Sequence, residues 1–269
     1  RFLMKLFAKK SLGQHFLNST HVLDQIISAA HIKQGETLLE IGPGTGVLTR
    51  ALLNSGAHVI AVEKDQRAIG MLEQDFFTEI KEGALKIISG DVLYENTLKT
   101  ETISNGSYAL VANIPYYITG AILEKFLEHE PRPNRMVLLV QKEVAERICV
   151  RDGKESILSV SVKAFGTPKI IAKVPPGAFT PPPTVDSAIL AIENVSGAQF
   201  SSKNVDISRF FRIVKAGFAH KRKFVARNLE AVLSEEEIET IWKKLGLNEK
   251  IRAEDMTVEQ WIAIAHTSL

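Results

Sequence analysis

The chain has 269 residues, of which 45% are hydrophobic and 24% charged, and its net charge at pH 7 is +2. These values are typical of a globular protein with one large and one small domain. No apolar stretch approaches the length of a transmembrane helix, so we expect no membrane contact. The single cysteine, Cys149, excludes an internal disulfide and favours a cytoplasmic location.

Apolar, β-branched runs alternate with helical segments in the first part of the chain. The predicted strands are 37–41, 58–62, 85–88, 109–112 and 136–140. The predicted helices are 19–30, 121–129 and 143–150, with two more that end near residues 53 and 77. Five strand–helix units in succession predict a mostly parallel, Rossmann-like sheet of the α/β class.

The pattern changes in the next segment. Two further strands, 169–174 and 187–192, flank the link 175–183, which has five prolines in nine residues and therefore cannot be a helix. We expect these two strands to form an antiparallel pair at the edge of the sheet.

The polar stretch 196–199 predicts a domain boundary. It separates a sheet domain, 1–195, from a small all-helical domain, 196–269. The helices predicted for the second domain are 207–219, 224–233, 235–245 and 258–267.

Four residues, Asn113-Ile114-Pro115-Tyr116, follow the buried strand 109–112, so we expect them at the rim of the sheet, where open α/β folds bind ligands. The Asn113 side-chain carbonyl accepts hydrogen bonds, and Pro115 keeps the preceding residue extended, so that the Ile114 carbonyl is a second acceptor. Tyr116 provides a flat ring for stacking. This combination favours a planar ligand with an exocyclic NH2 group, such as adenine. The alternative is an ordinary strand end with a proline turn and a half-buried tyrosine.

A glycine-rich turn, Gly42-x-Gly44-x-Gly46, follows the first strand of the sheet and is preceded by Glu40. Such a turn lets a ligand approach backbone N–H groups closely. The dinucleotide fingerprint requires a further glycine at the position of Val47, and its absence argues against NAD.

Acidic residues end the next two strands. Glu63 is placed to accept hydrogen bonds from two ribose hydroxyls, and Asp91 to accept one from an adenine amino group. Taken singly, either acid is as well explained as a helix cap. Two such acids beside a glycine turn favour a nucleoside site.

The chain resembles the class I S-adenosylmethionine-dependent adenine-N6 methyltransferases in Glu40-Ile41-Gly42-Pro43-Gly44-Thr45-Gly46, Glu63, Asp91 and Asn113-Ile114-Pro115-Tyr116. Four further stretches resemble the small-subunit ribosomal RNA adenine-N6 dimethyltransferase family, of the KsgA type. They are Leu12 to Leu17, Phe179 to Ser187, Phe218 to Lys223, and Arg252-Ala253-Glu254.

The resemblance implies S-adenosylmethionine as cofactor and N6,N6-dimethylation of two adjacent adenines in the 3′-terminal hairpin loop of small-subunit (16S) rRNA. It also implies a role in subunit maturation, small-subunit rRNA in a pre-ribosomal particle as partner, a monomeric enzyme and no metal. The implied cofactor-binding residues are Gln14, His15, Leu17, Glu40, Gly42, Gly44, Gly46, Glu63, Lys64, Asp91, Val92 and Asn113.

The same resemblance implies that Asn113-Ile114-Pro115-Tyr116 hold the target adenine and that Phe179 stacks on its other face. The family often has Asn where His15 stands and Leu where Ile114 stands. With His15, the contact comes from the ring or from the backbone alone. Ile114 is a conservative change, because its carbonyl makes the contact.

A run of basic residues without any acid lies between Ser208 and Leu229. A charge run is often only a solvated helix face, but in a chain with an adenine site it favours contact with RNA phosphates. The predicted RNA-binding residues are Arg209, Arg212, Lys215, Lys221, Arg222, Lys223 and Arg227.

Three alternatives remain open. A sister enzyme that dimethylates large-subunit rRNA and confers macrolide resistance would share the pocket motifs, although the 220–223 stretch and Arg252-Ala253-Glu254 favour the small-subunit group. A noncatalytic assembly or transcription factor would keep the fold and the basic surface. An NAD-dependent dehydrogenase is the third alternative.

Overall fold

The computed structural model describes residues 8–9, 13–94, 97–98, 103, 107–150 and 154–266. By its internal contacts the chain forms two compact units. Unit 1 comprises residues 1–145 and 169–195, and unit 2 comprises residues 146–168 and 196–269. Among the described residues, no helix is both long and apolar enough to cross a bilayer.

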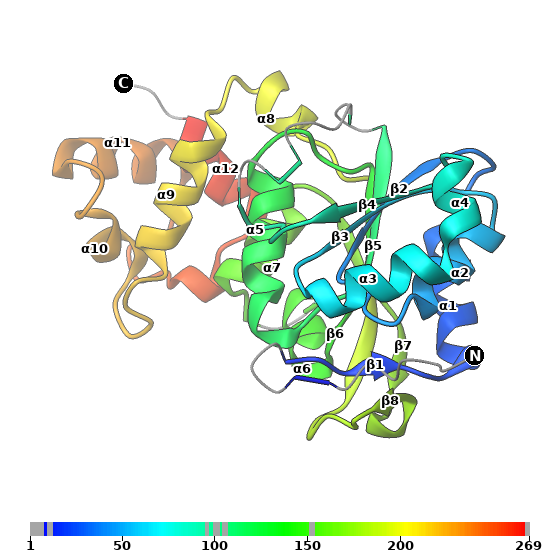
Figure 1. Ribbon diagram of the computed structural model, residues 1–269. Coiled ribbons are helices and arrows are strands. Elements are labelled where there is room, and N and C mark those ends of the chain that lie inside the picture. Colours follow the sequence, from blue (N-terminus) through cyan, green and yellow to red (C-terminus); the bar gives the residue numbers. More distant parts are fainter. Residues whose placement is uncertain are drawn as a thin grey trace. The chain divides into compact units, whose positions relative to one another are not determined.

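Unit 1 is built on a seven-stranded sheet (Figure 1). Its strands are β2 (Thr37–Ile41), β3 (His58–Glu63), β4 (Leu85–Ser89), β5 (Tyr108–Asn113), β6 (Arg135–Gln141), β7 (Thr167–Val174) and β9 (Ser187–Glu193). In space they follow the order β4-β3-β2-β5-β6-β9-β7. The first five pair in parallel, and β9 runs antiparallel to β6. The predicted α/β class, with a mostly parallel sheet and an antiparallel edge, is confirmed.

The order in which the strands are added to the sheet changes direction at the boundary between the neighbouring strands β2 and β5. From β2 it adds β3 and β4 outward on one side, and β5 then returns to pair with β2 on the other side. At such a switch point the loops that follow the two neighbouring strands diverge. The crevice between them is where open α/β sheets bind ligands.

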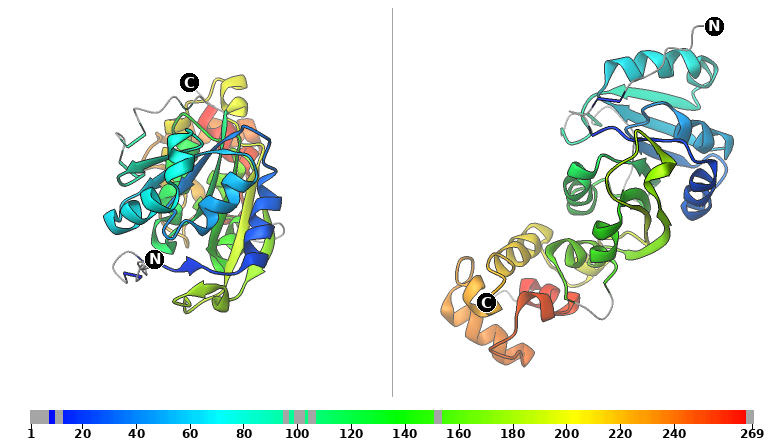
Figure 2. Two further views of the ribbon diagram at one scale, coloured as in Figure 1. Left: turned by 45° about the vertical axis from the view of Figure 1, so that its right-hand side comes forward. Right: turned by 90° about the horizontal axis from the view of Figure 1, so that it is seen from below.

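Helices cover both faces of this sheet (Figures 1 and 2). Ala109 and Val111 of β5 share one buried cluster with Ile26 and Leu52, from α1 and α2. The alternate side chains of β5 point to the opposite face, where α5 lies. Residues 108–112 are each at most 1% exposed, which explains their continuous apolar run. The helices are α1 (Thr20–Ala30), α2 (Val47–Asn54), α3 (Gln66–Asp75), α4 (Phe77–Lys81), α5 (Thr119–Glu128) and α6 (Lys142–Ile148).

A separate two-stranded sheet joins distant parts of the chain. β1 (Phe16–Leu17) pairs antiparallel with β8 (Phe179–Thr180). Asn18 continues this contact, because its N–H donates to the Ala178 carbonyl at 2.9 Å and its side-chain amide donates to the Thr180 hydroxyl at 2.7 Å. The N-terminal motif and the proline-rich link are therefore neighbours in space.

The described residues of unit 2 are mainly helical. Phe165 stacks on Phe200 and Phe211, with ring centroids 4.8 and 5.8 Å away. α11 begins with a reciprocal capping box between Ser234 and Glu237. The helices are α7 (Ile157–Lys163), α8 (Ala198–Ser202), α9 (Ile207–Gly217), α10 (Val225–Leu229), α11 (Glu235–Leu245) and α12 (Val258–His266), with the 3-10 turn η4 (Ala253–Asp255).

Residues 146–168 belong to unit 2, whereas the predicted boundary placed them in the first domain. The stacking of Phe165 on rings of the C-terminal segment accounts for this. No element is predicted for residues 157–163, where the structure has α7. This helix begins with a capping box between Ser156 and Ser159. The predicted helix 224–233 is shorter in the structure and ends with α10.

We expect Gly46→Ala to lower the free energy of unfolding by roughly 2–4 kcal/mol. Gly46 has a φ of 77°, and an added Cβ would lie 2.6 Å from the buried Phe76 ring and 2.8 Å from Leu72. Gly35→Ala is the matched control, since its φ is 73° but no atom lies within 4 Å of the added Cβ, so only backbone strain of about 1 kcal/mol applies. Equal losses in urea unfolding would contradict the packing argument.

Candidate functional site

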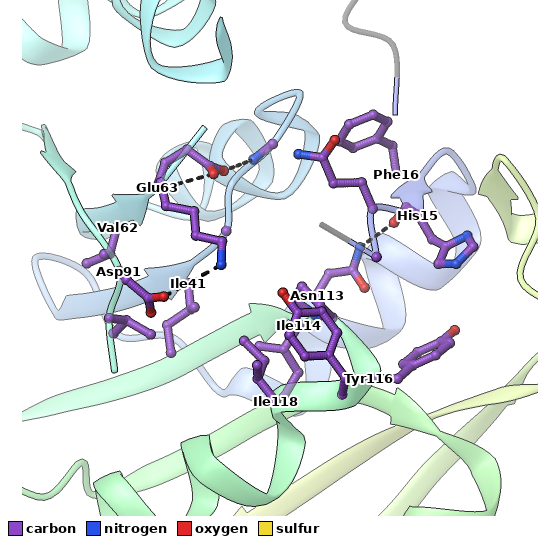
Figure 3. A pocket seen from close by; sticks show the side chains of 18 of the residues that line it. His15, Phe16, Ile41, Val62, Glu63, Asp91, Asn113, Ile114, Tyr116 and Ile118 are labelled. Atoms are coloured by element: carbon purple, nitrogen blue, oxygen red, sulfur yellow. Dashed lines mark hydrogen bonds and ion pairs between the residues drawn. The ribbon is translucent and has the colours of Figure 1, made fainter. Parts of the chain in front are cut away.

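A pocket opens at the carboxyl ends of β2, β3, β4 and β5, beside the switch point of the sheet (Figure 3). Its walls come from the N-terminal segment, the glycine loop, the ends of β3 and β4, and the turn after β5. The lining residues are Gly13, Gln14, His15, Phe16, Ile41, Gly42, Gly44, Val62, Glu63, Lys64, Gly90, Asp91, Val92, Asn113, Ile114, Pro115, Tyr116, Tyr117 and Ile118. Most residues predicted for the cofactor and the target adenine thus share one pocket.

Asn113, the last residue of β5, lines this pocket next to the N-terminal segment (Figure 3). Its Nδ2 donates a hydrogen bond to the His15 carbonyl at 3.0 Å. Because a carbonyl accepts only from a donor, this bond fixes the orientation of the amide. The side-chain oxygen of Asn113 is therefore the atom left to accept a hydrogen bond from a ligand.

Tyr116 begins the short 3-10 helix η2 (Tyr116–Ile118), directly after the extended Pro115. Its hydroxyl shares a hydrogen bond of 2.6 Å with Ser187 Oγ. The His15 ring lies nearly parallel to the Tyr116 ring, at an interplanar angle of 19° and a centroid distance of 5.9 Å. Burial raises the pKa of Tyr116, although the Ser187 hydrogen bond opposes this, so the hydroxyl is neutral at pH 7. The ring is thus held in one plane at the pocket.

The glycine loop presents bare backbone to the pocket. Gly42 and Gly44 have φ angles of 67° and 55°, which residues with side chains adopt only at a cost. An added Cβ at Gly42 would meet no protein atom within 4 Å, whereas one at Gly44 would approach the Phe16 ring to 3.0 Å. The space beside Gly42 is therefore left for a ligand.

Glu63 is 6% exposed, and its carboxylate accepts three backbone hydrogen bonds. Gly44 donates to Oε2 at 3.1 Å, and Lys64 and Asp65 each donate to Oε1 at 2.9 Å. A carboxylate has about four acceptor positions, so about one remains for a ligand hydroxyl. Two ribose hydroxyls, as predicted from the sequence, would bind only if one of these backbone bonds opened.

Asp91 lies after β4, and its Oδ2 is 3.5 Å from Lys64 Nζ (Figure 3). Its Oδ1 accepts a hydrogen bond from the Leu93 N–H at 3.0 Å. Burial lowers the pKa of Lys64, but Tyr117 and Asp91 outweigh this effect and raise it. The Asp91 carboxylate is therefore oriented from two sides.

Three of the predicted cofactor residues do not line this pocket. Gly46 packs against Phe76 instead. Leu17, which is 5% exposed, and Glu40, which is 1% exposed, line a smaller pocket that shares the walls of Gly42 and Asn113. Leu17 and Glu40 thus lie beside Gly42 and Asn113 but outside the main pocket.

Phe179 is also not brought to the pocket. Its side chain is 3% exposed and lies in the hydrophobic core of unit 1 with Leu17, because the pairing of β8 with β1 turns it inward. The predicted stacking of Phe179 on a target base therefore has no exposed ring face in this structure. The ring that stacks on Tyr116 is that of His15.

Sequence reasoning missed several residues of the site. Tyr117 lines the pocket and is 62% exposed, and the doubled tyrosine was the signal that could have indicated it. Ser187 ends the Phe179 to Ser187 stretch, but no role was predicted for it, because its contact is with the Tyr116 hydroxyl from another part of the chain. Among the described residues, no three His, Cys, Asp or Glu side chains lie close enough together to hold a metal ion.

The predicted RNA-binding residues lie on α9, on α10 and in the turn between them, within unit 2. All of them are exposed except Arg209, which is partly buried. Arg227 pairs with Glu230 at 2.7 Å, and Lys215 Nζ lies 6.0 Å from the centre of the Phe211 ring. The acid-free run therefore forms a basic surface on this unit.

A family model described as ribosomal RNA adenine dimethylase matches residues 6–268. The chain belongs to this family. Curated relatives carry a name from the same area: the ribosomal RNA small subunit methyltransferase A of Dehalococcoides mccartyi is 40% identical, over 95% of this chain and 87% of that protein. The protein of the same name from Thermosynechococcus vestitus is 37% identical, over 96% of each chain.

Solved structures give the same result for the fold. A dimethyladenosine transferase from Plasmodium falciparum is 27% identical, with a TM-score of 0.76 over 93% of this chain and 96% of that chain. The 23S rRNA methyltransferase ErmE is 24% identical, with a TM-score of 0.65, and this likeness concerns the fold alone. The expected Rossmann-like methyltransferase fold and rRNA adenine dimethylase family are thus confirmed.

Glu40 should make the stability of the fold depend on pH. Burial raises the pKa of Glu40 from 4.5 to about 8; the hydrogen bond from Thr49 lowers it, and the charge of Glu63 adds to the increase. The unfolded chain thus releases this proton near pH 4.5, whereas the folded chain keeps it to about pH 8. The contribution of Glu40 to stability is therefore lost as the pH rises through this window, and it levels off above the window.

Glu40→Gln is neutral at every pH and keeps an acceptor for Thr49, whose hydroxyl lies 2.7 Å from Glu40 Oε2. We expect the variant to gain stability relative to the wild type between pH 5 and pH 8, by on the order of 3 kcal/mol. Urea unfolding at several pH values measures this difference. A difference that stays constant with pH would show that Glu40 is ionised in the folded chain.

Proposed function

We propose that this family member dimethylates N6 of two adjacent adenines in the 3′-terminal hairpin loop of small-subunit rRNA. The observation that carries the proposal is the Asn113 amide, whose oxygen is left as an acceptor in a pocket that also holds the glycine loop and Asp91. The relatives named small subunit methyltransferase A support the choice of subunit. We further propose that the substrate is a pre-ribosomal particle in the cytoplasm and that the enzyme acts as a monomer.

The pocket fits S-adenosylmethionine by its chemistry. The open backbone at Gly42 would receive the amino acid end of the cofactor, Glu63 a ribose hydroxyl and Asp91 the adenine amine. Gln14, His15, Lys64 and Val92 also line the pocket and would complete these contacts. When bound, this cofactor supplies a methyl group on a positively charged sulfur, so the electrophile needs no further activation.

The protein then has to increase the reactivity of a poor nucleophile. The amine of adenine is weakly nucleophilic because its lone pair is delocalised into the ring. The Asn113 oxygen and the Ile114 carbonyl would accept its two hydrogens, and this contact strengthens as positive charge develops on the nitrogen. Tyr116 would hold the base plane, so that the lone pair points at the methyl group.

A target adenine must leave its stack to reach this pocket, which favours loop RNA over duplex RNA. A large-subunit rRNA methyltransferase remains the rival function, since the likeness to ErmE shows that the fold serves that substrate class too. Incubating purified small and large subunits in parallel with methyl donor, and then mapping the modified adenines by mass, tests the proposal. Methylation confined to large subunits would overturn it.

Tyr116→Ala should lower methyl transfer by about 100-fold or more while cofactor affinity stays within about twofold, because the ring is assigned to the target base. Tyr116→Phe is the control. It keeps the ring and loses only the hydrogen bond to Ser187, so it should cost less than about tenfold. Single-turnover rates and calorimetric binding of the cofactor separate the two effects. An equal collapse of cofactor binding in Tyr116→Ala would contradict this division of roles.

Asp91→Ala should have the opposite profile, with cofactor affinity weaker by about tenfold and RNA affinity unchanged. Asp91→Asn keeps an oxygen that can accept from the Leu93 N–H and from a ligand amine, so its loss should be smaller. Titration calorimetry with the cofactor and a filter-binding assay with RNA measure the two affinities. Unchanged cofactor binding in Asp91→Ala would remove Asp91 from the site.

A further inference from the structure

The turn between α9 and α10 combines positive charge with an exposed aromatic ring. Residues 219–224 of this turn are all exposed, and they include Lys221, Arg222 and Lys223. Among the described residues, no carboxylate forms an ion pair with any of these three. Phe224 ends the turn, and this residue is 37% exposed.

The turn is held by buried groups rather than by its own side chains. Asn228 is 4% exposed, and its Nδ2 donates to the Gly217 carbonyl at 2.6 Å and to the His220 carbonyl at 3.1 Å. The Lys223 N–H donates to the same His220 carbonyl at 3.0 Å. The start of the turn is thus tied to a residue of α10.

Both ends of the turn are also anchored in the core of unit 2. At one end, Gly217 lies against the fully buried Trp261, and an added Cβ would come within 2.3 Å of that ring. At the other end, Val225 is 0% exposed, and its N–H donates to the Ile251 carbonyl at 3.0 Å. Val225 is thus buried, whereas the neighbouring Phe224 is partly exposed.

We propose that Phe224 stacks on an unpaired base of the RNA substrate while Lys221, Arg222 and Lys223 contact the flanking phosphates. A basic groove with an aromatic platform is the combination that binds single-stranded nucleic acid without reading its sequence. A ring on a turn that is already rigid loses little conformational entropy when it stacks, which favours this role. The inference rests on the proposed RNA substrate, but it concerns a contact outside the pocket.

Two RNAs of equal length and charge test the proposal. One is a hairpin with an unpaired loop, and the other is a fully paired duplex. The stacking role requires that Phe224→Ala weaken hairpin binding by about fivefold or more and leave duplex binding unchanged. Fluorescence anisotropy at one fixed salt concentration measures both affinities, because phosphate contacts depend strongly on salt.

Three control variants test whether the flat ring of Phe224 accounts for the loss of hairpin binding. Phe224→Trp keeps an aromatic face and should bind the hairpin as the wild type does. Phe224→Leu keeps the hydrophobicity without the flat ring, so it should behave as Phe224→Ala. Phe77→Ala removes a ring in unit 1 that is 67% exposed, and it should leave both affinities unchanged. Thermal unfolding confirms that each variant is folded.

Three results would overturn the proposal: wild-type affinity of Phe224→Ala for both RNAs, an equal loss for both, or tight binding by Phe224→Leu. The first would assign the turn to another partner, such as an acidic protein, and the second would make Phe224 a structural residue. Failure of the proposed function is a separate observation. It would appear as an absence of methyl transfer by the wild type, whatever the ratio of the two RNA affinities.

Discussion

The hydrogen bond from Asn113 to the His15 carbonyl is the contact on which the pocket depends. It joins the end of the central strand β5 to a segment near the N-terminus that is distant from it in sequence. It also decides which atom of the amide is left to accept. With the amide turned over, two N–H groups would face the amine of a bound adenine, and donor would oppose donor. One bond thus sets both the shape and the polarity of the proposed target site.

Two buried carboxyl groups, those of Glu40 and Glu63, lie at the glycine loop. Glu63 accepts hydrogen bonds from three backbone N–H groups. Glu40 is buried beside the Thr49 hydroxyl, and burial raises its pKa to about 8, so it keeps its proton at neutral pH. Because Glu40 keeps its proton, it adds no buried negative charge beside the Glu63 carboxyl group.

The sequence was most informative where function depends on strand ends. Parallel strands deliver the residues that follow them to one edge, so Gly42, Glu63, Asp91 and Asn113 could be brought together without coordinates. Where the structure differs from the expectations, the difference depends on contacts between distant segments. Phe179 is buried because β8 pairs with β1, and residues 146–168 join unit 2 because Phe165 stacks on rings far along the chain. No local pattern encodes such pairings.

The ladder between β1 and β8 has only two residue pairs. Such a short ribbon has little stability of its own. Strand β5, which ends at Asn113, is by contrast covered on both faces. One wall of the pocket thus belongs to a long parallel ladder, whereas the other belongs to a ladder of two pairs. An enzyme that adds methyl groups in succession has to exchange its used cofactor between additions. For the proposed dimethylation, we therefore expect the wall beside β1 to be the one that opens for this exchange.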